Sequence, residues 1–280
     1  MTRRLLCTDL DRTLIPNGAQ AESPGARERF CQLAGREEVT LAYVSGRHRA
    51  LIEQAIAEYD LPQPDYAIAD VGATIYRVKA GRWEIWEEWE AQIAPDWRGL
   101  SHDALRDLLQ ISPALTLQEQ GKQNRHKLSF YLDLDADIPA LLERLREVLA
   151  REGIKANLIY SVDEADVLGL LDVLPASANK LHAIRFLMET KQFALKDTLF
   201  AGDSGNDLDV LLSEVPSVLV ANAASEVREL ASAAHHPSLY IAWGGYLGMN
   251  GNYSGGILEG AAHFWPEADG WQRQQTDKES

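Results

Sequence analysis

The sequence predicts an α/β protein built on a parallel β-sheet. Short apolar runs rich in β-formers alternate with segments of helical period, and the connections are short enough for β-α-β units. The length of 280 residues corresponds to about two domains. Hydrophobic residues make up 46% of the chain and charged residues 25%, proportions that are typical of globular proteins.

The alternation places strands and helices along both ends of the chain. The expected strands are Arg4–Leu10, Val39–Val44, Tyr66–Ala69, Thr198–Ala201, Ser217–Val220 and Leu239–Ala242. The expected helices are Pro24–Ala34, Arg49–Glu58, Lys180–Glu189, Asp207–Leu212 and Ser225–Ala233.

The middle of the chain, from about Lys79 to Val167, has a different pattern. A helix at 103–109, a strand at 126–133, a long amphipathic helix at 139–152 and a strand at 156–161 indicate a small inserted α+β layer. We expect the parallel sheet to resume with Leu170–Leu174. The chain is therefore predicted to have a split core domain (1–78 and 168–265), an insertion (79–167), and a polar tail (266–280) that frays.

Charge and cysteine content exclude several classes of protein. The chain has 27 basic and 42 acidic residues, a net charge of −15. This balance argues against nucleic acid as the partner, and an anionic substrate must be held by local positive charge. Only Cys7 and Cys31 occur, so no disulfide framework is expected. The sequence shows no secretory signal and no long apolar run, so we predict a cytoplasmic protein with no membrane association.

The first candidate site is Asp9-Leu10-Asp11. Along the expected strand Asp9 and Asp11 start on one face, where their like charges repel. A hard cation such as Mg²⁺, which binds one or two carboxylates together with substrate oxygens, compensates this repulsion. A polar strand end with Asp11 capping a turn is the alternative that these residues leave open.

A second acidic segment follows a later strand, within Gly202-Asp203-Ser204-Gly205-Asn206-Asp207. Asp203 and Asp207 lie four residues apart across a turn, so both could face one cation. The density of acidic and glycine residues favours a site over an ordinary loop.

Ser45-Gly46 and Lys180 supply groups that could bind an anion. Ser45 and Gly46 lie between a strand and a helix, where a hydroxyl, an amide and a helix N-terminus can hold a phosphate, although a simple helix cap has the same pattern. Lys180 begins a helix, where a cation opposes the helix dipole unless an anion lies opposite. We expect Arg47 to pack on its own helix.

These segments combine into one site, because the carboxyl ends of the strands in an open α/β sheet share one crevice. The carboxylates supply metal and acid groups, and Ser45 and Lys180 supply phosphate ligands. This inventory suits phosphoryl transfer, in which positioning and charge neutralisation dominate catalysis.

The four segments resemble, in order, the four motifs of the haloacid dehalogenase-like phosphatase superfamily. The resemblance implies a Rossmann-like, doubly wound parallel sheet with an inserted α+β cap domain of type IIB. It also implies that Asp9 is the nucleophile and Asp11 the general acid and base. The phosphate ligands would be Ser45, Gly46, Lys180 and Asn206; the ligands of Mg²⁺ would be Asp9, Asp11 through its main-chain carbonyl, Asp203 and Asp207.

More narrowly, the chain resembles sucrose-6-phosphate phosphatases and their glycosyl-phosphate relatives. The residues that carry this resemblance are His126–Tyr131, Leu171–Pro175 and Gly255–Phe264. Two features depart from the family: Leu181 stands where relatives have glycine, and Val162–Gly169 is longer than usual. The second departure leaves the preferred disaccharide open.

The expected function is Mg²⁺-dependent hydrolysis of sucrose-6-phosphate through an aspartyl-phosphate. The alternatives are mannosylfructose-phosphate, mannosylglycerate-phosphate or trehalose-6-phosphate as substrate, a phosphotransferase or mutase, or a non-catalytic partner domain of a sugar synthase. Lys127 is the residue expected to bind the sugar, because alternation places it with Ser129 and Tyr131 on one strand face. A sugar-phosphate synthase is a further candidate partner.

Overall fold

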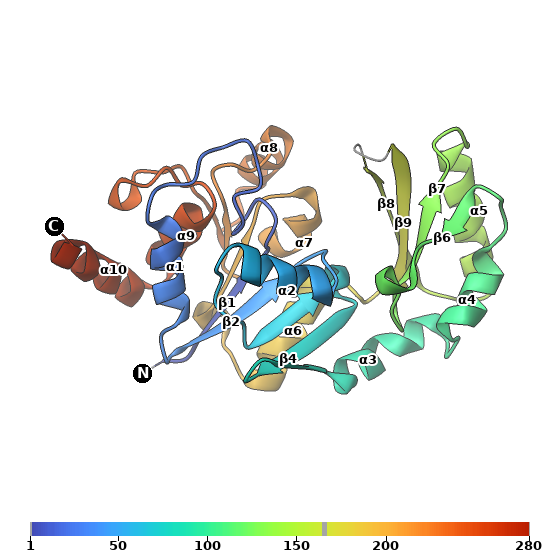
Figure 1. Cartoon of the computed structure of the whole chain (residues 1–280), viewed down its shortest axis with the longest axis horizontal. Coiled ribbons are helices and arrows are strands. Elements are labelled where there is room, and N and C mark those ends of the chain that lie inside the picture. Colours follow the sequence, from blue (N-terminus) through green and yellow to red (C-terminus); the bar gives the residue numbers. More distant parts are fainter. Residues whose placement is uncertain (1, 164–166, 280) are drawn as a thin grey trace. The chain divides into compact units, whose positions relative to one another are not determined.

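The computed structural model describes residues 2–163 and 167–279 (Figure 1). The chain forms two compact units. The core unit comprises Met1–Glu84 and Lys180–Ser280, and the inserted unit comprises Ile85–Asn179. The inserted unit thus extends further toward the C-terminus than the insertion expected at 79–167.

The core unit is built on one sheet with the strand order β12-β11-β10-β1-β2-β3-β4-β5. All neighbours from β12 to β3 pair in parallel, and β4 pairs antiparallel with β3. The strands are β1 Arg4–Thr8, β2 Val39–Val44, β3 Tyr66–Ala69, β4 Thr74–Lys79, β5 Arg82–Ile85, β10 Thr198–Gly202, β11 Ser217–Leu219 and β12 Leu239–Ile241. The predicted α/β fold with a doubly wound, mainly parallel sheet is confirmed.

Both faces of the sheet are buried at the central strands β1, β2 and β10, which explains why these strands are almost entirely apolar. Leu5, Leu6 and Cys7 of β1 have no exposed surface. Leu6 packs in one cluster with Phe30 and Ile257. The helices of the core unit are α1 Ala26–Ala34, α2 Arg49–Glu58, α6 Lys180–Lys191, α7 Leu208–Leu211, α8 Ser225–Ala234, α9 Ser254–Phe264 and α10 Pro266–Glu279.

Helix α9 packs closely on the sheet and on α1 (Figure 1). A Cβ atom at Gly260 would lie 2.5 Å from the Cβ of Val218 on β11, so a larger residue does not fit there. Helix α10 follows, and the expectation of a frayed tail at 266–280 is wrong for residues 266–279. Ala268 is buried, and Asp269 accepts hydrogen bonds from Tyr246 and Arg273.

The inserted unit contains a four-stranded sheet in the order β6-β7-β9-β8, with all neighbours antiparallel. Its strands are β6 Leu115–Leu117, β7 Leu128–Leu132, β8 Ala156–Asp163 and β9 Leu168–Pro175, and its main helices are α3 Glu87–Ile93, α4 His102–Leu109 and α5 Ile138–Arg151. Leu105, Leu145, Phe130 and Leu171 belong to its core.

The prediction that Leu170–Leu174 returns to the parallel sheet is wrong, since β9 lies between β7 and β8. Leu171 and Val173 are buried, whereas Leu170 and Asp172 are partly exposed. This alternation is typical of an antiparallel strand packed on one face. The described residues contain no helix long and apolar enough to cross a bilayer.

Candidate active site

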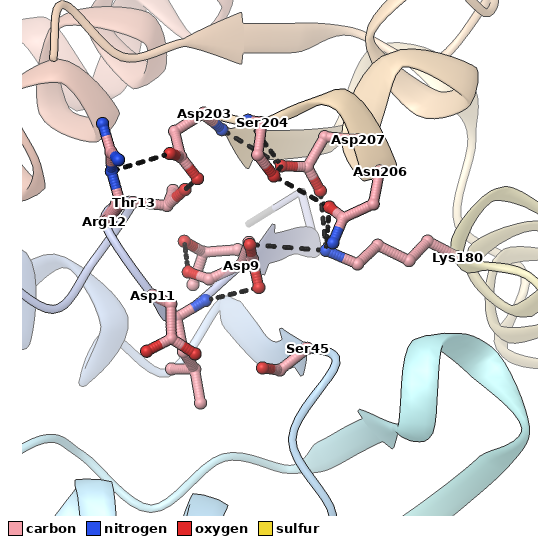
Figure 2. A network of polar contacts seen from close by, with 12 residues as sticks. Asp9, Asp11, Arg12, Thr13, Ser45, Lys180, Asp203, Ser204, Asn206 and Asp207 are labelled. Atoms are coloured by element: carbon pink, nitrogen blue, oxygen red, sulfur yellow. Dashed lines mark hydrogen bonds and ion pairs between the residues drawn. The ribbon is translucent and has the colours of Figure 1, made fainter. Parts of the chain in front are cut away.

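The candidate site lies at the carboxyl ends of three neighbouring core strands (Figure 2). Asp9 follows β1, Ser45 follows β2 and Asp203 follows β10. Lys180 begins α6, and Asp207 precedes α7. The structure therefore brings together side chains separated by almost 200 positions in the sequence, as expected for the crevice of an open α/β sheet.

Asp11 lies differently from the expected position on a strand face. β1 ends at Thr8, and the amides of Thr13, Leu14 and Ile15 all donate to the carbonyl of Leu10. Arg12 adopts a left-handed conformation with φ of 59°. The chain therefore turns immediately after Leu10, so Asp9 and Asp11 are not alternate residues of one strand.

The Asp11 carboxylate is held by Arg47 and Asn17. Arg47 donates from Nε to Oδ2 (2.8 Å) and from Nη2 to Oδ1 (2.7 Å), and Asn17 Nδ2 donates to Oδ1 (2.7 Å). Partial burial acts to raise the pKa of Asp11, but the hydrogen bonds and charge of Arg47 outweigh burial and lower it. The expectation that Arg47 packs on its own helix thus missed its ion pair with Asp11.

Asp9 is buried beside the positive charge of Lys180. Its Oδ1 accepts from the amide of Leu10 (2.8 Å), and its Oδ2 lies 3.4 Å from Lys180 Nζ. Burial, together with the charges of Asp207 and Asp203, raises the pKa of Asp9 to about 8 despite Lys180. Additional positive charge at this position would therefore be strongly favoured.

Lys180 is only 2% exposed and connects three side chains of the site. Its Nζ lies 2.7 Å from Asp207 Oδ1, 3.4 Å from Asp9 Oδ2 and 3.2 Å from Asn206 Oδ1. Burial opposes its charge, but Asp207 and Asp9 raise the pKa of Lys180 above its ordinary value. The favourable partners explain why a cation is tolerated at the start of a helix.

Asp207 uses its second oxygen to fix the loop after β10. Oδ2 accepts from the amides of Asp203 and Ser204 and from Ser204 Oγ, each at 3.1 Å. A Cβ atom at Gly202 would lie 2.8 Å from Asp207 Cβ, so glycine is required for this close approach. Asp207 accepts three hydrogen bonds at Oδ2 and pairs with Lys180 at Oδ1, more interactions than Asp9 or Asp203 makes, so it is the least available of the three acids to bind a metal directly.

Asp203 is buried and is oriented by two residues that the sequence reasoning did not select. Thr13 Oγ1 donates to Oδ1 (3.0 Å), and Arg12 Nε lies 3.5 Å from Oδ2. Burial and the charge of Asp207 raise the pKa of Asp203 to about 6. Thr13 and Arg12 directly follow Asp11, so their place in the first motif was the available signal.

Carboxylate oxygens of Asp9, Asp203 and Asp207 lie within 4.8 Å of one another. Among the described residues, the buried basic side chain that pairs with these carboxylates is Lys180. When ionised, the three acids outnumber Lys180 and the partly exposed Arg12, so negative charge remains in excess, and an all-oxygen donor set suits a hard divalent cation. The residues therefore fit a Mg²⁺ site.

Ser45 and Gly46 form the third side of the site. Ser45 is buried, and its Oγ accepts from the amide of Arg47 (3.2 Å). The neighbouring turn Asp70–Gly72 donates from the Val71 amide to the Ser45 carbonyl (3.0 Å). Val71 has a φ of 58°, a strained conformation for a β-branched residue, so this turn holds the Ser45 loop at a conformational cost.

Lys127 lies in the inserted unit, immediately before β7. It is buried and forms an ion pair with Asp172 of β9 at 3.3 Å. Ser129 Oγ donates to the same carboxylate at 2.5 Å, and Tyr131 contacts Lys122 and Glu119. Sequence reasoning did not select Asp172, which is brought opposite Ser129 by the β7–β9 register.

Comparison with known proteins identifies solved structures that share this fold. A sucrose-phosphatase structure from Synechocystis sp., solved with sucrose and phosphate, superposes with a TM-score of 0.72. It is 28% identical and covers 94% of this chain and 98% of that one. A haloacid dehalogenase-like hydrolase from Bacillus subtilis shares the fold at 18% identity and a TM-score of 0.66.

The fold and the site define a haloacid dehalogenase-like phosphatase, a phosphoric monoester hydrolase. The model of the sucrose-6F-phosphate phosphohydrolase family matches residues 2–265, so the chain belongs to this family. A HAD-like hydrolase of Nitrosococcus oceani is 54% identical over 95% of this chain and 73% of its own length. The mannosylfructose-phosphate phosphatase of Agrobacterium fabrum is 31% identical over 93% of this chain and 96% of its own length.

Proposed function

We propose that this chain is a Mg²⁺-dependent phosphatase that hydrolyses sucrose-6-phosphate to sucrose and phosphate, with Asp9 as the nucleophile. The observation that carries the proposal is the buried Asp9 carboxylate, beside Lys180, at the end of the central strand. Its attack on phosphorus would form an aspartyl-phosphate and break the bond to the sugar oxygen.

Asp11 would donate a proton to the departing sugar oxygen and then accept one from the water that attacks the aspartyl-phosphate. This second attack releases phosphate and regenerates the Asp9 carboxylate. In the structure Asp11 is paired with Arg47, so the acid–base role requires Asp11 to leave this ion pair.

Four residues would bind the oxygens of the phosphoryl group: Ser45, Gly46, Lys180 and Asn206. Lys180 already lies next to Asp9 and Asn206, so its charge would bear on a phosphoryl group transferred to Asp9. The local positive charge is needed because the whole chain carries a net charge of −15.

Mg²⁺ would be held by Asp9, the main-chain carbonyl of Asp11, Asp203 and, directly or closely, Asp207. When bound, the ion would neutralise the negative charge that the phosphoryl oxygens bring into the site. The excess of buried carboxylates over ammonium groups supports this assignment.

The substrate is assigned by similarity to proteins named for sucrose phosphate and for mannosylfructose phosphate. Both sugars contain a fructosyl unit, and either glycosyl-fructose phosphate is compatible with this support. We assign contact with the sugar to Lys127 of the inserted unit, whose ammonium group pairs with Asp172, the carboxylate that also accepts a hydrogen bond from Ser129. Association with a sugar-phosphate synthase stays a prediction.

The experiment measures phosphate release with Mg²⁺ and no added acceptor. The panel contains sucrose-6-phosphate, mannosylfructose-phosphate, mannosylglycerate-phosphate, trehalose-6-phosphate and phosphoglycolate. We expect the highest kcat/KM for sucrose-6-phosphate. A higher value for mannosylfructose-phosphate would transfer the assignment to that substrate, phosphoryl transfer only to an added sugar would indicate a phosphotransferase, and no turnover would favour a non-catalytic domain.

A further inference from the structure

A cavity of about 470 Å³ lies beside the edge strand β12 of the core unit. Its walls come from the loop after β12 and from helices α9 and α10, and none of the proposed catalytic residues lines it. The volume is within the range of small-molecule sites. The lining side chains used below are Tyr240, Trp243, Tyr246, Glu259, His263, Asp269 and Arg273.

Trp243 forms an exposed but oriented aromatic surface at this cavity. Its side chain is 78% exposed, the largest value among the exposed large hydrophobic residues of the described chain. The indole Nε1 nevertheless donates to Tyr240 Oη at 3.0 Å, which fixes the edge of the ring and leaves its faces in water. A rigid, solvent-facing indole is suited to stacking on a ligand.

The loop that carries Trp243 is anchored by a buried acid, Glu259 of α9. Oε1 accepts from Tyr240 Oη (2.8 Å) and from the amide of Trp243 (3.2 Å), and Oε2 accepts from the amide of Gly244 (3.0 Å). Glu259 is 4% exposed, and these partners are all neutral donors. With one bond, Oε2 keeps capacity to accept another.

The opposite wall supplies both donors and acceptors. Tyr246 Oη and Arg273 Nε both donate to Asp269 Oδ1, at 3.0 and 2.8 Å. Among the described residues, the terminal nitrogens of Arg273 and Oδ2 of Asp269 have no hydrogen-bond partner. His263 stacks on Tyr240 with ring centroids 4.4 Å apart and completes the aromatic lining.

This combination selects the chemical class of the ligand. The two carboxylates, Glu259 and Asp269, disfavour an anion such as phosphate. Asp269 is already paired with Arg273, and Glu259 is buried among neutral donors, so neither carboxylate is presented as an open site for a cation. A neutral molecule with many hydroxyl groups uses both kinds of polar group, because each hydroxyl donates and accepts. The C–H face of a sugar ring is in addition complementary to the exposed indole.

We propose that the cavity beside β12 binds a neutral saccharide, at a site distinct from the phosphoryl-transfer centre. Trp243 provides the stacking surface, Glu259 and Asp269 accept hydrogen bonds from sugar hydroxyls, and Arg273 donates to sugar oxygens. The site uses no residue of the proposed phosphatase reaction, so it can be tested independently of that reaction.

The test uses the full chain labelled with fluorinated tryptophan and observed by ¹⁹F NMR. The signal of Trp243 is identified as the one missing from Trp243→Phe, and maltose, sucrose, glycerol and inorganic phosphate are titrated separately. We expect the two disaccharides to shift the Trp243 signal saturably, with dissociation constants on the order of millimolar. Glycerol and inorganic phosphate should leave this signal in place.

Two surface variants separate local binding from an indirect effect of sugar at the catalytic centre. Arg273→Ala should weaken the binding seen at Trp243 about tenfold, as expected for one lost charge-assisted hydrogen bond. Arg185→Ala, which removes a partly exposed arginine of α6 that pairs with Glu214, should leave the binding seen at Trp243 unchanged. Both should hydrolyse a small aryl phosphate like the unmodified chain. A Trp243 signal unmoved at sugar concentrations on the order of 100 mM, or moved equally in Arg273→Ala, overturns the proposal.

Discussion

Replacing Lys180 with methionine tests the electrostatics of the candidate site most severely. The substitution keeps much of the side-chain volume but removes a charge that is 2% exposed and lies 2.7 Å from Asp207 and 3.4 Å from Asp9. Removing one partner of a buried ion pair costs about 3 to 5 kcal/mol, because the remaining charges lose their compensation. In a domain of this size that loss lowers Tm by about 6 to 20 °C.

The cost should depend on pH and on Mg²⁺. Without Lys180 the folded state holds protons on its carboxylates more tightly than the unfolded state does, so stability of the variant falls as pH rises. The pKa of Asp9 is about 8 even with Lys180 present, so Asp9 is largely protonated at about pH 6. The stability lost through Lys180→Met should therefore be smaller at about pH 6 than at about pH 9. Mg²⁺ should raise the Tm of Lys180→Met more than that of the unmodified chain, since it replaces the missing positive charge.

The assay is thermal unfolding between about pH 6 and 9, with Mg²⁺ or with chelator. Lys196→Met is the matched control, because Lys196 is an exposed lysine of the same unit. Its stability should stay within about 0.5 kcal/mol of the unmodified chain. Equal Tm values for the two methionine variants, with equal responses to Mg²⁺, would refute the picture of an under-neutralised buried acidic cluster.

Three further outcomes are expected. Asp9→Asn should lower turnover by about 10⁴-fold or more, because an amide is a poor nucleophile, and Asp11→Asn should also impair turnover. Steady-state phosphate release measures both variants. An undiminished rate in either variant would remove the role assigned to that residue. Chelator should abolish hydrolysis and Ca²⁺ should inhibit it, since Ca²⁺ takes more ligands at longer distances; activity in excess chelator would contradict a metal requirement. Burial and the charge of Arg125 lower the pKa of His126 to about 4, below the ordinary value of about 6.5. Acidification between these two values therefore favours the unfolded state, and at about pH 5 the free energy of unfolding should be about 1 to 2 kcal/mol lower than at neutral pH. Urea unfolding measures this loss, and His126→Gln should flatten the pH dependence.

The strand ends were the features that the sequence predicted best. Apolar runs followed by Asp9, Ser45 and Asp203 identify buried strands and the polar groups at their carboxyl ends, because the apolar pattern of a strand and the side chains that follow it are local properties of the sequence. The orientation of Asp11 was not predictable in this way. It depends on a left-handed turn at Arg12 and on Arg47, which lies 36 positions away.

Two other differences have the same origin in tertiary context. The apolar run of β9 is compatible with either sheet, and only its pairing with β7 and β8 places it in the inserted unit. The polar residues 266–279 form α10 because a few buried positions, such as Ala268, face the core unit. Asp172 could not be selected as a neighbour of Lys127 without knowing the register of β7 and β9.

Direct detection of phosphorylated Asp9 tests the central claim. The chain, and Asp11→Asn to slow breakdown of the intermediate, are mixed with sucrose-6-phosphate and Mg²⁺, quenched in acid, digested, and analysed by mass spectrometry. We predict one added phosphoryl group on the peptide that contains Asp9, at higher occupancy in Asp11→Asn. Continued turnover without phosphorylation of that peptide, or phosphorylation at another residue, would contradict the account.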